Sequence, residues 1–294
     1  MDKRPIFPYV LEMHLVDHCN LNCKGCSHFS SLVKGQALID IDDLTQDLQR
    51  FRELFSDVYE IRLMGGEPLL HPDICKFIEN TRHIFQKTSI AIYTNGILLK
   101  EMPNIFWEAC RVNHAYIKLT KYPIQLDIKA IKQIAKANHV RIKIPKQVNI
   151  FYKFINIKGD SDPEKSFRSC RAVHICPFLR NGKLFTCAFA PHVHLFNQFF
   201  DQSIPVTEGD YVDIYGDVTP EEILDFLMHP VPLCQWCNVQ RVPFDWGKSN
   251  QDIQEWINGK TNTATHFWYI TKRSAINIYH RTKHYLEIRT RKLK

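Results

Sequence analysis

The sequence lacks any apolar run long enough to cross a bilayer, which argues against a membrane-spanning helix. Its first fifteen residues carry charges but lack the apolar core and the small-residue cleavage site of a secretory signal. We therefore expect a cytoplasmic protein. Thiols stay reduced in that compartment, so the ten cysteines are not expected to form a disulfide framework, and metal binding or catalysis is favoured.

The excess of positive charge is confined to the last 35 residues, and the rest of the chain is nearly neutral. The formal net charge is +7, yet nine Lys or Arg residues and a single acid, Glu287, lie between Lys260 and the last residue. Three interpretations of this basic, aromatic-containing tail stay open: a solvated helix, a contact with an anionic membrane, or a contact with nucleic acid. The solvated helix is the default expectation, because charged stretches are usually solvated.

Strands alternate with helices over the first half of the chain, which predicts parallel βα units. The expected strands are 9–16, 58–64, 89–94, 114–120, 140–144 and one near 148–157; the expected helices are 43–55, one from about 72, and 127–138. These units are too few for a complete eight-stranded barrel. We predict an α/β fold with three parts: an open, partial (β/α)6 TIM-type barrel in residues 1–164, a small auxiliary domain of a β-hairpin plus a helix in 165–245, and a basic helical tail in 246–294.

Several expected strands alternate polar and apolar residues, whereas strands of a fully covered parallel sheet are almost wholly apolar. The apolar face should meet the helices, and the polar face should line the barrel lumen. We expect the substrate to meet these polar residues: Glu12, His14, Arg62, Lys118, Arg141 and Lys143. The alternative is that some strands are edge strands with one wet face.

Three cysteines, Cys19, Cys23 and Cys26, follow the first expected strand at C-x3-C-x2-C spacing. Three thiolates leave one iron of a [4Fe–4S] cluster open, whereas zinc would need a fourth ligand such as His28. The cysteines lie at the carboxyl-terminal rim, where βα barrels place their chemistry. Two further strands end at that rim in polar or glycine-containing turns: Gly65-Gly66-Glu67-Pro68 and Thr94-Asn95-Gly96.

Together these motifs resemble the radical S-adenosylmethionine (radical SAM) superfamily over about residues 9–160. The resemblance implies that the three cysteines hold a [4Fe–4S] cluster, which cleaves SAM to a 5′-deoxyadenosyl radical that abstracts hydrogen from the substrate. It also implies the residues that bind SAM: Gly65, Gly66, Glu67 and Pro68 at the methionine end, and Thr94 and Asn95 near the ribose. One position departs from the family, which usually has an aromatic residue where this chain has Gly25. His28 or Phe29 would serve instead, or the adenine would pack differently.

Four late cysteines form a second set: Cys170, Cys187, Cys234 and Cys237. The turn Asn181-Gly182 lies between the first two and predicts a hairpin. Four thiolates suit zinc or a fully ligated [4Fe–4S] cluster. Over about residues 165–240 the pattern resembles the twitch domain, a shortened SPASM domain, which implies a second, auxiliary [4Fe–4S] cluster. Cys176 could replace Cys170 as a ligand, be a spare thiol, or donate hydrogen to a substrate radical.

Two histidines that follow Cys187, His192 and His194, could act as bases near the substrate, although a structural role is the more common one for histidine. Relatives with a twitch domain include dehydrogenases that oxidise a secondary alcohol of a cyclitol. The resemblance and the base-containing lumen lead to one hypothesis: an oxidoreductase or epimerase acting on a small, sugar-like or nucleotide-linked polar substrate, with an external electron donor of the flavodoxin or ferredoxin type.

Three other functions compete with this hypothesis. A maturase that modifies a peptide or protein would be typical of SPASM relatives, but no peptide-binding extension is evident before Tyr9. An RNA-modifying enzyme would use the basic tail and show a steep salt dependence of RNA binding. A zinc-stabilised binding module would be no enzyme at all and would hold zinc without iron.

Overall fold

The computed structural model describes residues 4–257, apart from residues 171 and 174. Its centre is a sheet in the strand order β5-β4-β3-β2-β1-β7-β8-β9. The strands of this sheet are β1 (Ile6–Val16), β2 (Asp57–Gly65), β3 (Ser89–Thr94), β4 (Tyr116–Leu119), β5 (Ile142–Lys143), β7 (Phe178–Arg180), β8 (Lys183–Phe185) and β9 (Tyr211–Asp213). From β5 to β7 the neighbours run parallel, and the sheet does not close among the described residues, which confirms the predicted partial TIM-type barrel.

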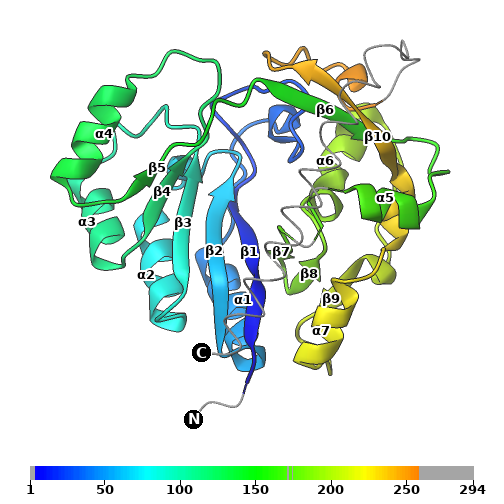
Figure 1. Cartoon of the computed structure of the whole chain (residues 1–294), viewed down its shortest axis with the longest axis horizontal. Helices are drawn as coiled ribbons and strands as arrows, with labels where there is room; N and C mark the ends of the chain where they lie inside the picture. The colour runs from blue at the N-terminus through cyan, green and yellow to red at the C-terminus, as the bar shows by residue number, and fades with distance from the viewer. Residues whose placement is uncertain (1–3, 171, 174, 258–294) are drawn as a thin grey trace.

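Helices cover the outer face of the parallel strands (Figure 1). They are α1 (Ile41–Leu54), α2 (Ile74–Ile84), α3 (Asn104–Val112) and α4 (Ile128–Ala137). The Asp40 carboxylate accepts hydrogen bonds from the first turn of α1, and Asp127 does the same for α4, so acidic caps fix where these helices begin. Their apolar faces pack on alternate residues of β1, such as Leu11, Met13 and Leu15, which are fully buried. The polar residues between them face the lumen, as the alternation predicts.

The sixth parallel strand is β7, not the expected strand near 148–157. That segment forms β6 (Ile150–Ile155), which pairs antiparallel with β10 (Cys237–Asp245) in a separate two-stranded sheet. In Figure 1 these two strands lie above the central sheet, on the side of the cysteine loop. β7 takes the place beside β1 through the pairing of Phe178 with Glu12.

The predicted hairpin at Asn181-Gly182 is confirmed as β7 and β8. It extends the barrel sheet, so residue 165 is not a boundary of that sheet. The other helices of the second half are α5 (Pro163–Ser169), α6 (Phe189–Phe200) and α7 (Pro220–Phe226). A second apolar cluster, which includes Phe178, Phe196 and Trp256, packs α6 against the cysteine loop.

Residues 246–257 are not part of a tail, contrary to the prediction. They lie on the cysteine loop: the Lys24 amide donates to Gly247 O at 2.8 Å, and the Trp256 indole donates to Cys26 O at 2.8 Å. Residues 258–294, and with them the interpretations of the basic tail, lie outside the described residues.

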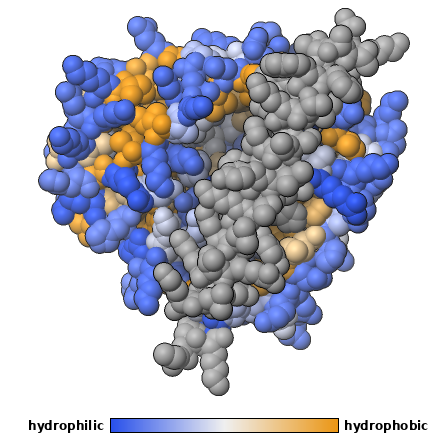
Figure 2. Space-filling model, in the orientation of Figure 1, coloured by the Kyte–Doolittle hydropathy of each residue, from blue (hydrophilic) through white to orange (hydrophobic). Residues whose placement is uncertain are grey.

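The described surface in Figure 2 is mostly hydrophilic, with smaller hydrophobic areas on the side of α3 and α4. α3 exposes Ile105 and Val112. No described helix has the length and apolar character that crossing a membrane requires.

Candidate active site

A cavity of about 280 Å³ opens at the carboxyl-terminal rim of the barrel. Its lining includes all three cysteines of the C-x3-C-x2-C motif, which come from the loop after β1. Three rim segments also line it: Gly65-Gly66 at the end of β2, Thr94-Asn95 at the end of β3, and Thr120 after β4. The turns that the sequence assigns to one rim therefore do meet at one cavity.

The three thiols lie close enough to influence one another. Burial, the largest cause, raises the pKa of Cys19 and of Cys23 to about 12, and the neighbouring thiols add to both shifts. Burial likewise raises the pKa of Cys26. A metal centre overcomes such a penalty because it binds the thiolate form. Three converging thiols at a cavity are thus a donor set that fits an iron–sulfur cluster with one open iron.

Gly25 has a steric explanation. Its φ of 60° is left-handed, and a Cβ there would lie 2.5 Å from Phe244 Cζ and 2.7 Å from Glu255 O. The residue before Cys26 therefore cannot be aromatic in this loop. Phe29 does not serve instead, because it is fully buried in the second apolar cluster. His28 does line the cavity.

Aromatic surfaces of the cavity come from residues that the sequence analysis missed. Tyr93, Tyr122 and Phe151 line it, and Tyr122 stacks on Trp246 with ring centroids 6.0 Å apart. The Trp246 indole lies 3.2 Å from Cys23 Sγ as a donor. Tyr93 could have been found from its place directly before Thr94 on an alternating strand. Tyr122 follows the end of β4 and Phe151 lies in β6, both without a motif, so only the fold brings them here.

The two glycines of the Gly65–Pro68 turn serve close backbone packing. A Cβ on Gly65 would lie 2.3 Å from Val16 O, and one on Gly66 would lie 2.0 Å from His18 O. Both residues line the cavity, so the turn still presents backbone to it. The glycines are needed because the end of β2 lies directly against the end of β1.

Glu67 faces inward, which gives no support to its predicted contact with the methionine end of SAM. The side chain is fully buried, and neither Glu67 nor Pro68 lines the cavity. Its carboxylate accepts hydrogen bonds from Thr94 Oγ1 at 2.7 Å, the Asn95 amide at 2.8 Å and the Leu69 amide at 3.2 Å. Burial nevertheless raises the pKa of Glu67 to about 7. Glu67 therefore holds two rim turns together. Asn95 connects them to the cysteine loop, because its Nδ2 donates to Asn20 Oδ1 at 2.8 Å.

Arg62 is the centre of a polar network in the lumen. It donates to Glu12 Oε1 and to Glu60 Oε1, each at 2.8 Å, and its guanidinium lies 4.7 Å from the centre of the Tyr93 ring. Cys176 Sγ lies 3.3 Å from Arg62 Nη1, and burial holds the pKa of that thiol well above its ordinary value. Cys176 therefore belongs to the lumen.

Three other lumen cations lie over aromatic rings. Lys118 Nζ is 5.1 Å from the Tyr93 ring centre, and Lys143 Nζ is 4.1 Å and the Arg141 guanidinium 4.6 Å from that of Tyr116. Within residues 4–257, the structure shows no ion pair between any of the three and a carboxylate. Lys118 is half-buried, whereas Arg141 and Lys143 are exposed beside the edge strand β5. The wet-edge alternative thus accounts for the exposure of these two.

The late cysteines Cys170, Cys187, Cys234 and Cys237 form a second group of interacting thiols. Burial raises the pKa of Cys187 to about 11 and of Cys234 to about 12, with a further contribution from Cys170 in both cases. Arg241 is half-buried beside them and donates to Cys170 Sγ at 3.2 Å. Cys170 rather than Cys176 therefore lies with this set, which fits a four-thiolate metal centre.

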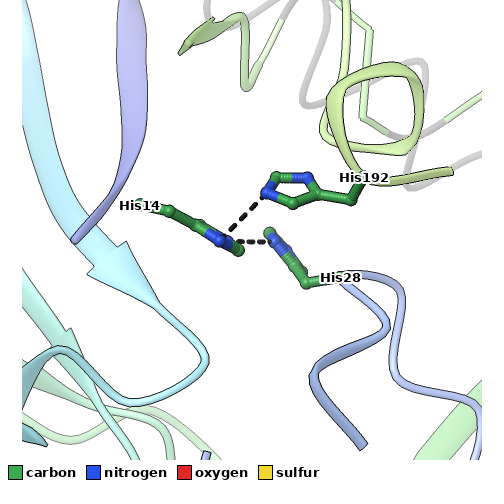
Figure 3. A group of neighbouring side chains, drawn as sticks. All are labelled: His14, His28 and His192. Atoms are coloured by element: carbon green, nitrogen blue, oxygen red, sulfur yellow. Dashed lines mark hydrogen bonds between the residues drawn. The ribbon is translucent and has the colours of Figure 1, made fainter. Parts of the chain in front are cut away.

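The predicted bases behave differently from one another. His194 is exposed on α6. His192 is fully buried and, with His14 and His28, forms a compact group of imidazoles (Figure 3). His14 is also buried and does not line the cavity at the cysteines, so its contact with the substrate stays a prediction. Neither His192 nor His194 lines that cavity, and the predicted role as a base is without geometric support.

Comparison with known proteins finds similarity over the same part of the chain, which contains the three cysteines and both rim turns. Residues 13–124 match the family model of the Radical SAM superfamily. GTP 3′,8-cyclase from Clostridium botulinum strain Hall is 30% identical over 168 residues, which are 52% of this chain and 49% of that protein. Probable GTP 3′,8-cyclase from Methanocaldococcus jannaschii is 31% identical over 177 residues, 55% of this chain and 56% of that protein. The chain thus spans about half the length of these curated relatives.

A similar solved structure is that of BtrN in complex with AdoMet and 2-DOIA. The TM-score is 0.50 at 18% sequence identity, and the match covers 81% of this chain and 94% of that one. At this identity the likeness concerns the fold alone.

Proposed function

We propose, from the premise that this chain belongs to the radical SAM superfamily, that it abstracts a hydrogen atom from a sugar-like or nucleotide-linked substrate and oxidises or epimerises the attacked carbon. Two similarities support a small polar substrate. The curated relatives are named for a reaction of GTP, and the BtrN structure was solved with a small molecule, 2-DOIA, beside AdoMet. The proposal also covers a cytoplasmic location and an electron donor of the flavodoxin or ferredoxin type.

The radical SAM family uses a [4Fe–4S] cluster and SAM, and the cavity at the rim fits both. Cys19, Cys23 and Cys26 would hold the cluster. When bound, the cluster and SAM supply a 5′-deoxyadenosyl radical that removes a hydrogen atom from the substrate. The protein contributes the enclosure: the backbone of Gly65 and Gly66, the side chains of Thr94 and Asn95, and the rings of Tyr122 and Phe151 line the space that SAM would fill.

The observation that carries the substrate class is a set of cations without an ion pair to a carboxylate in the described chain: Lys118 in the lumen, and Arg141 and Lys143 at its exposed edge. Tyr93 lines the cavity and also lies under Lys118 and Arg62, so the cavity and the basic surface are continuous. Cations that lack acidic partners are suited to a phosphate, as in a nucleotide-linked sugar. The exposed Arg141 and Lys143 at the edge strand leave room for a phosphate that projects towards solvent.

A second [4Fe–4S] cluster on Cys170, Cys187, Cys234 and Cys237 is part of the same proposal. Its chemistry would be one-electron transfer, which an oxidation needs after the first hydrogen atom has been removed. Arg241 supports this assignment, because a neighbouring cation favours the thiolate form of Cys170 and its neighbours. Cys176, half-buried beside Arg62, would be the thiol available on the substrate side, suited to hydrogen donation in an epimerisation.

The test is anaerobic turnover with SAM and dithionite, following 5′-deoxyadenosine. Candidate substrates are nucleotide sugars, the same sugars without phosphate, GTP and short RNA. We expect nucleotide sugars to stimulate 5′-deoxyadenosine formation and the free sugars to do so weakly. Equal, uncoupled formation with every compound would contradict the sugar proposal, and stimulation by GTP or RNA alone would replace it.

The lysine in the lumen offers a matched pair of variants. Lys118→Met should raise the KM for a phosphorylated substrate about tenfold or more, the range of one lost charged hydrogen bond, and change the KM for the free sugar little. Lys129→Met, at an exposed position of α4, is the control and should change neither. An unchanged KM in Lys118→Met would remove the phosphate contact from the proposal.

A further inference from the structure

We propose that His14, His28 and His192 form a binding site for one divalent transition-metal ion of the zinc type, separate from both cysteine sets. The three side chains come from segments far apart in the sequence: β1, the loop after Cys26, and α6. Figure 3 shows the imidazoles pointing toward one another. One nitrogen from each lies within 4.8 Å of the others.

The three rings are in direct contact, and a metal ion would require them to turn. His14 Nε2 lies 2.7 Å from His28 Nδ1, and His14 Nδ1 lies 2.9 Å from His192 Nε2. Ligand bonds of about 2.0–2.1 Å in a tetrahedral site place neighbouring nitrogens about 3.3 Å apart. These two contacts use different nitrogens of His14, so its ring would have to turn until one nitrogen faces both His28 and His192 before an ion could bind all three.

The surroundings orient the rings as in a metal site. His192 Nδ1 donates to Ala188 O at 2.7 Å, which directs the lone pair of Nε2 toward the other two histidines. A ligating histidine commonly donates its second ring N–H to a carbonyl or a carboxylate in this way. Asp17 lies 2.8 Å from His14 Nδ1 and 3.7 Å from His192 Nε2. Arg180 fixes its carboxylate with two hydrogen bonds of 2.8 and 2.7 Å, and Asp17 thereby offers an oxygen donor beside His14 for the fourth position.

The donor set points to the zinc type of ion. Imidazole nitrogen suits zinc, copper, iron and nickel, whereas magnesium and calcium prefer oxygen ligands. His14 and His192 are buried, and the ring of Phe178 packs edge-on against both, with centroids 5.1 and 4.8 Å away. Buried imidazoles stay neutral, the form that ligates a metal. An ion at this site would tie the first strand of the barrel to the cysteine loop and to α6.

One rival arrangement has no metal. His28 Nδ1–H could donate to His14 Nε2, and His14 Nδ1–H to Asp17, in a chain of hydrogen bonds. The hydrogen-bonded arrangement and the metal site make opposite predictions for zinc binding. In the hydrogen-bonded arrangement, the nitrogen of His14 that faces His28 is already an acceptor and is not free to ligate zinc. The two can therefore be separated by metal analysis.

The experiment uses anaerobically prepared protein with its cysteine sites loaded with iron, so that zinc cannot occupy them. The protein is incubated with zinc chloride and passed through a desalting column, and zinc and iron are then measured per chain. We expect about one zinc per chain, with a zinc-edge X-ray absorption spectrum that fits nitrogen and oxygen at about 2.0 Å. Absence of retained zinc, or zinc bonded to sulfur at about 2.3 Å, would overturn the proposal.

Variants assign the ligands. His28→Ala and His192→Gln should lower zinc affinity at least tenfold while the iron content is unchanged. The control is His194→Ala, two residues along the same helix and exposed, which should retain zinc. If His192→Gln does not fold, the spectrum of the natural protein and the His28→Ala variant still decide. None of these measurements involves SAM or substrate turnover, so the outcome is independent of the proposed function.

Discussion

Arg62 neutralises the charge of two largely buried carboxylates, those of Glu12 and Glu60. Glu12 and Glu60 have side chains only 7% and 12% exposed, and both accept a hydrogen bond from this one guanidinium. Arg62→Met keeps an apolar side chain of similar length but removes the cation. We expect the free energy of unfolding to fall by about 3–5 kcal/mol, because buried carboxylates would lose their counter-charge. Chemical denaturation of the anaerobic protein measures the change.

Lys76→Met is the control for this loss of charge. Lys76 pairs with Asp73 at 2.8 Å, but the pair is exposed to solvent, so the free energy of unfolding should not change measurably. If both variants changed stability equally, the compensating role of Arg62 would be wrong.

Glu67 predicts a pH dependence of stability. Burial raises its pKa to about 7 in the folded protein, above the ordinary value of 4.5. Between these pH values the folded protein binds more protons than the unfolded chain, so the contribution of Glu67 to stability falls as pH rises. The full shift corresponds to about 3 kcal/mol. We expect the natural protein to lose stability relative to Glu67→Gln between pH 5 and pH 7.5, in denaturation without SAM; parallel pH profiles of the two proteins would contradict the shift.

At the scale of elements, the cysteine loop depends on its packing against residues 244–257. The Cβ of Gly25→Ala would clash with Phe244 and with Glu255 O. The alanine would also be strained, because residue 25 has a left-handed backbone conformation. We expect the loop to shift and the iron content after reconstitution to fall by roughly half, since only the first cysteine set is affected. Iron analysis per chain measures this.

Gly35→Ala is the matched control for the loop. Gly35 also has a left-handed φ, of 74°, but a Cβ there meets nothing within 4 Å. Its iron content should match that of the natural protein. Loss of iron in both variants would show that backbone strain, rather than the contact with Phe244, sets the effect.

The sequence was sufficient for elements whose signals are local. The strand at 89–94, the capped helix after Asp40 and the hairpin at Asn181-Gly182 each carry their own pattern, and the structure has all three. β6 was misassigned because an alternating strand looks the same whichever sheet it joins. β7 has only three residues, too few for a period, and its place beside β1 is fixed by long-range pairing.

The candidate site was predictable to the same extent. The cysteines and the two rim turns could be found from motifs, and the structure brings them to one cavity. The direction of a side chain within a turn was not predictable, as Glu67 shows by facing inward. Nor was the grouping of His14, His28 and His192, because only the packing of α6 on the barrel brings position 192 to β1.

At the scale of the whole molecule, the proposed function requires two separate iron centres in one chain. With two [4Fe–4S] clusters the reconstituted protein should hold about eight iron atoms. Replacing Cys19, Cys23 and Cys26 with alanine should leave about four, and so should replacing Cys170, Cys187, Cys234 and Cys237. Iron and sulfide analysis with Mössbauer spectroscopy distinguishes the species. Zinc in place of iron at either set would contradict that assignment.

The decisive measurement is the transfer of hydrogen from the substrate to 5′-deoxyadenosine. A nucleotide sugar deuterated at single ring carbons would be incubated anaerobically with the protein, SAM and dithionite, and the 5′-deoxyadenosine analysed by mass spectrometry. The account predicts deuterium in 5′-deoxyadenosine from one sugar carbon and an oxidised or inverted product at that carbon. Formation of 5′-deoxyadenosine without deuterium from any sugar position, at a rate that ignores the sugar, would contradict it.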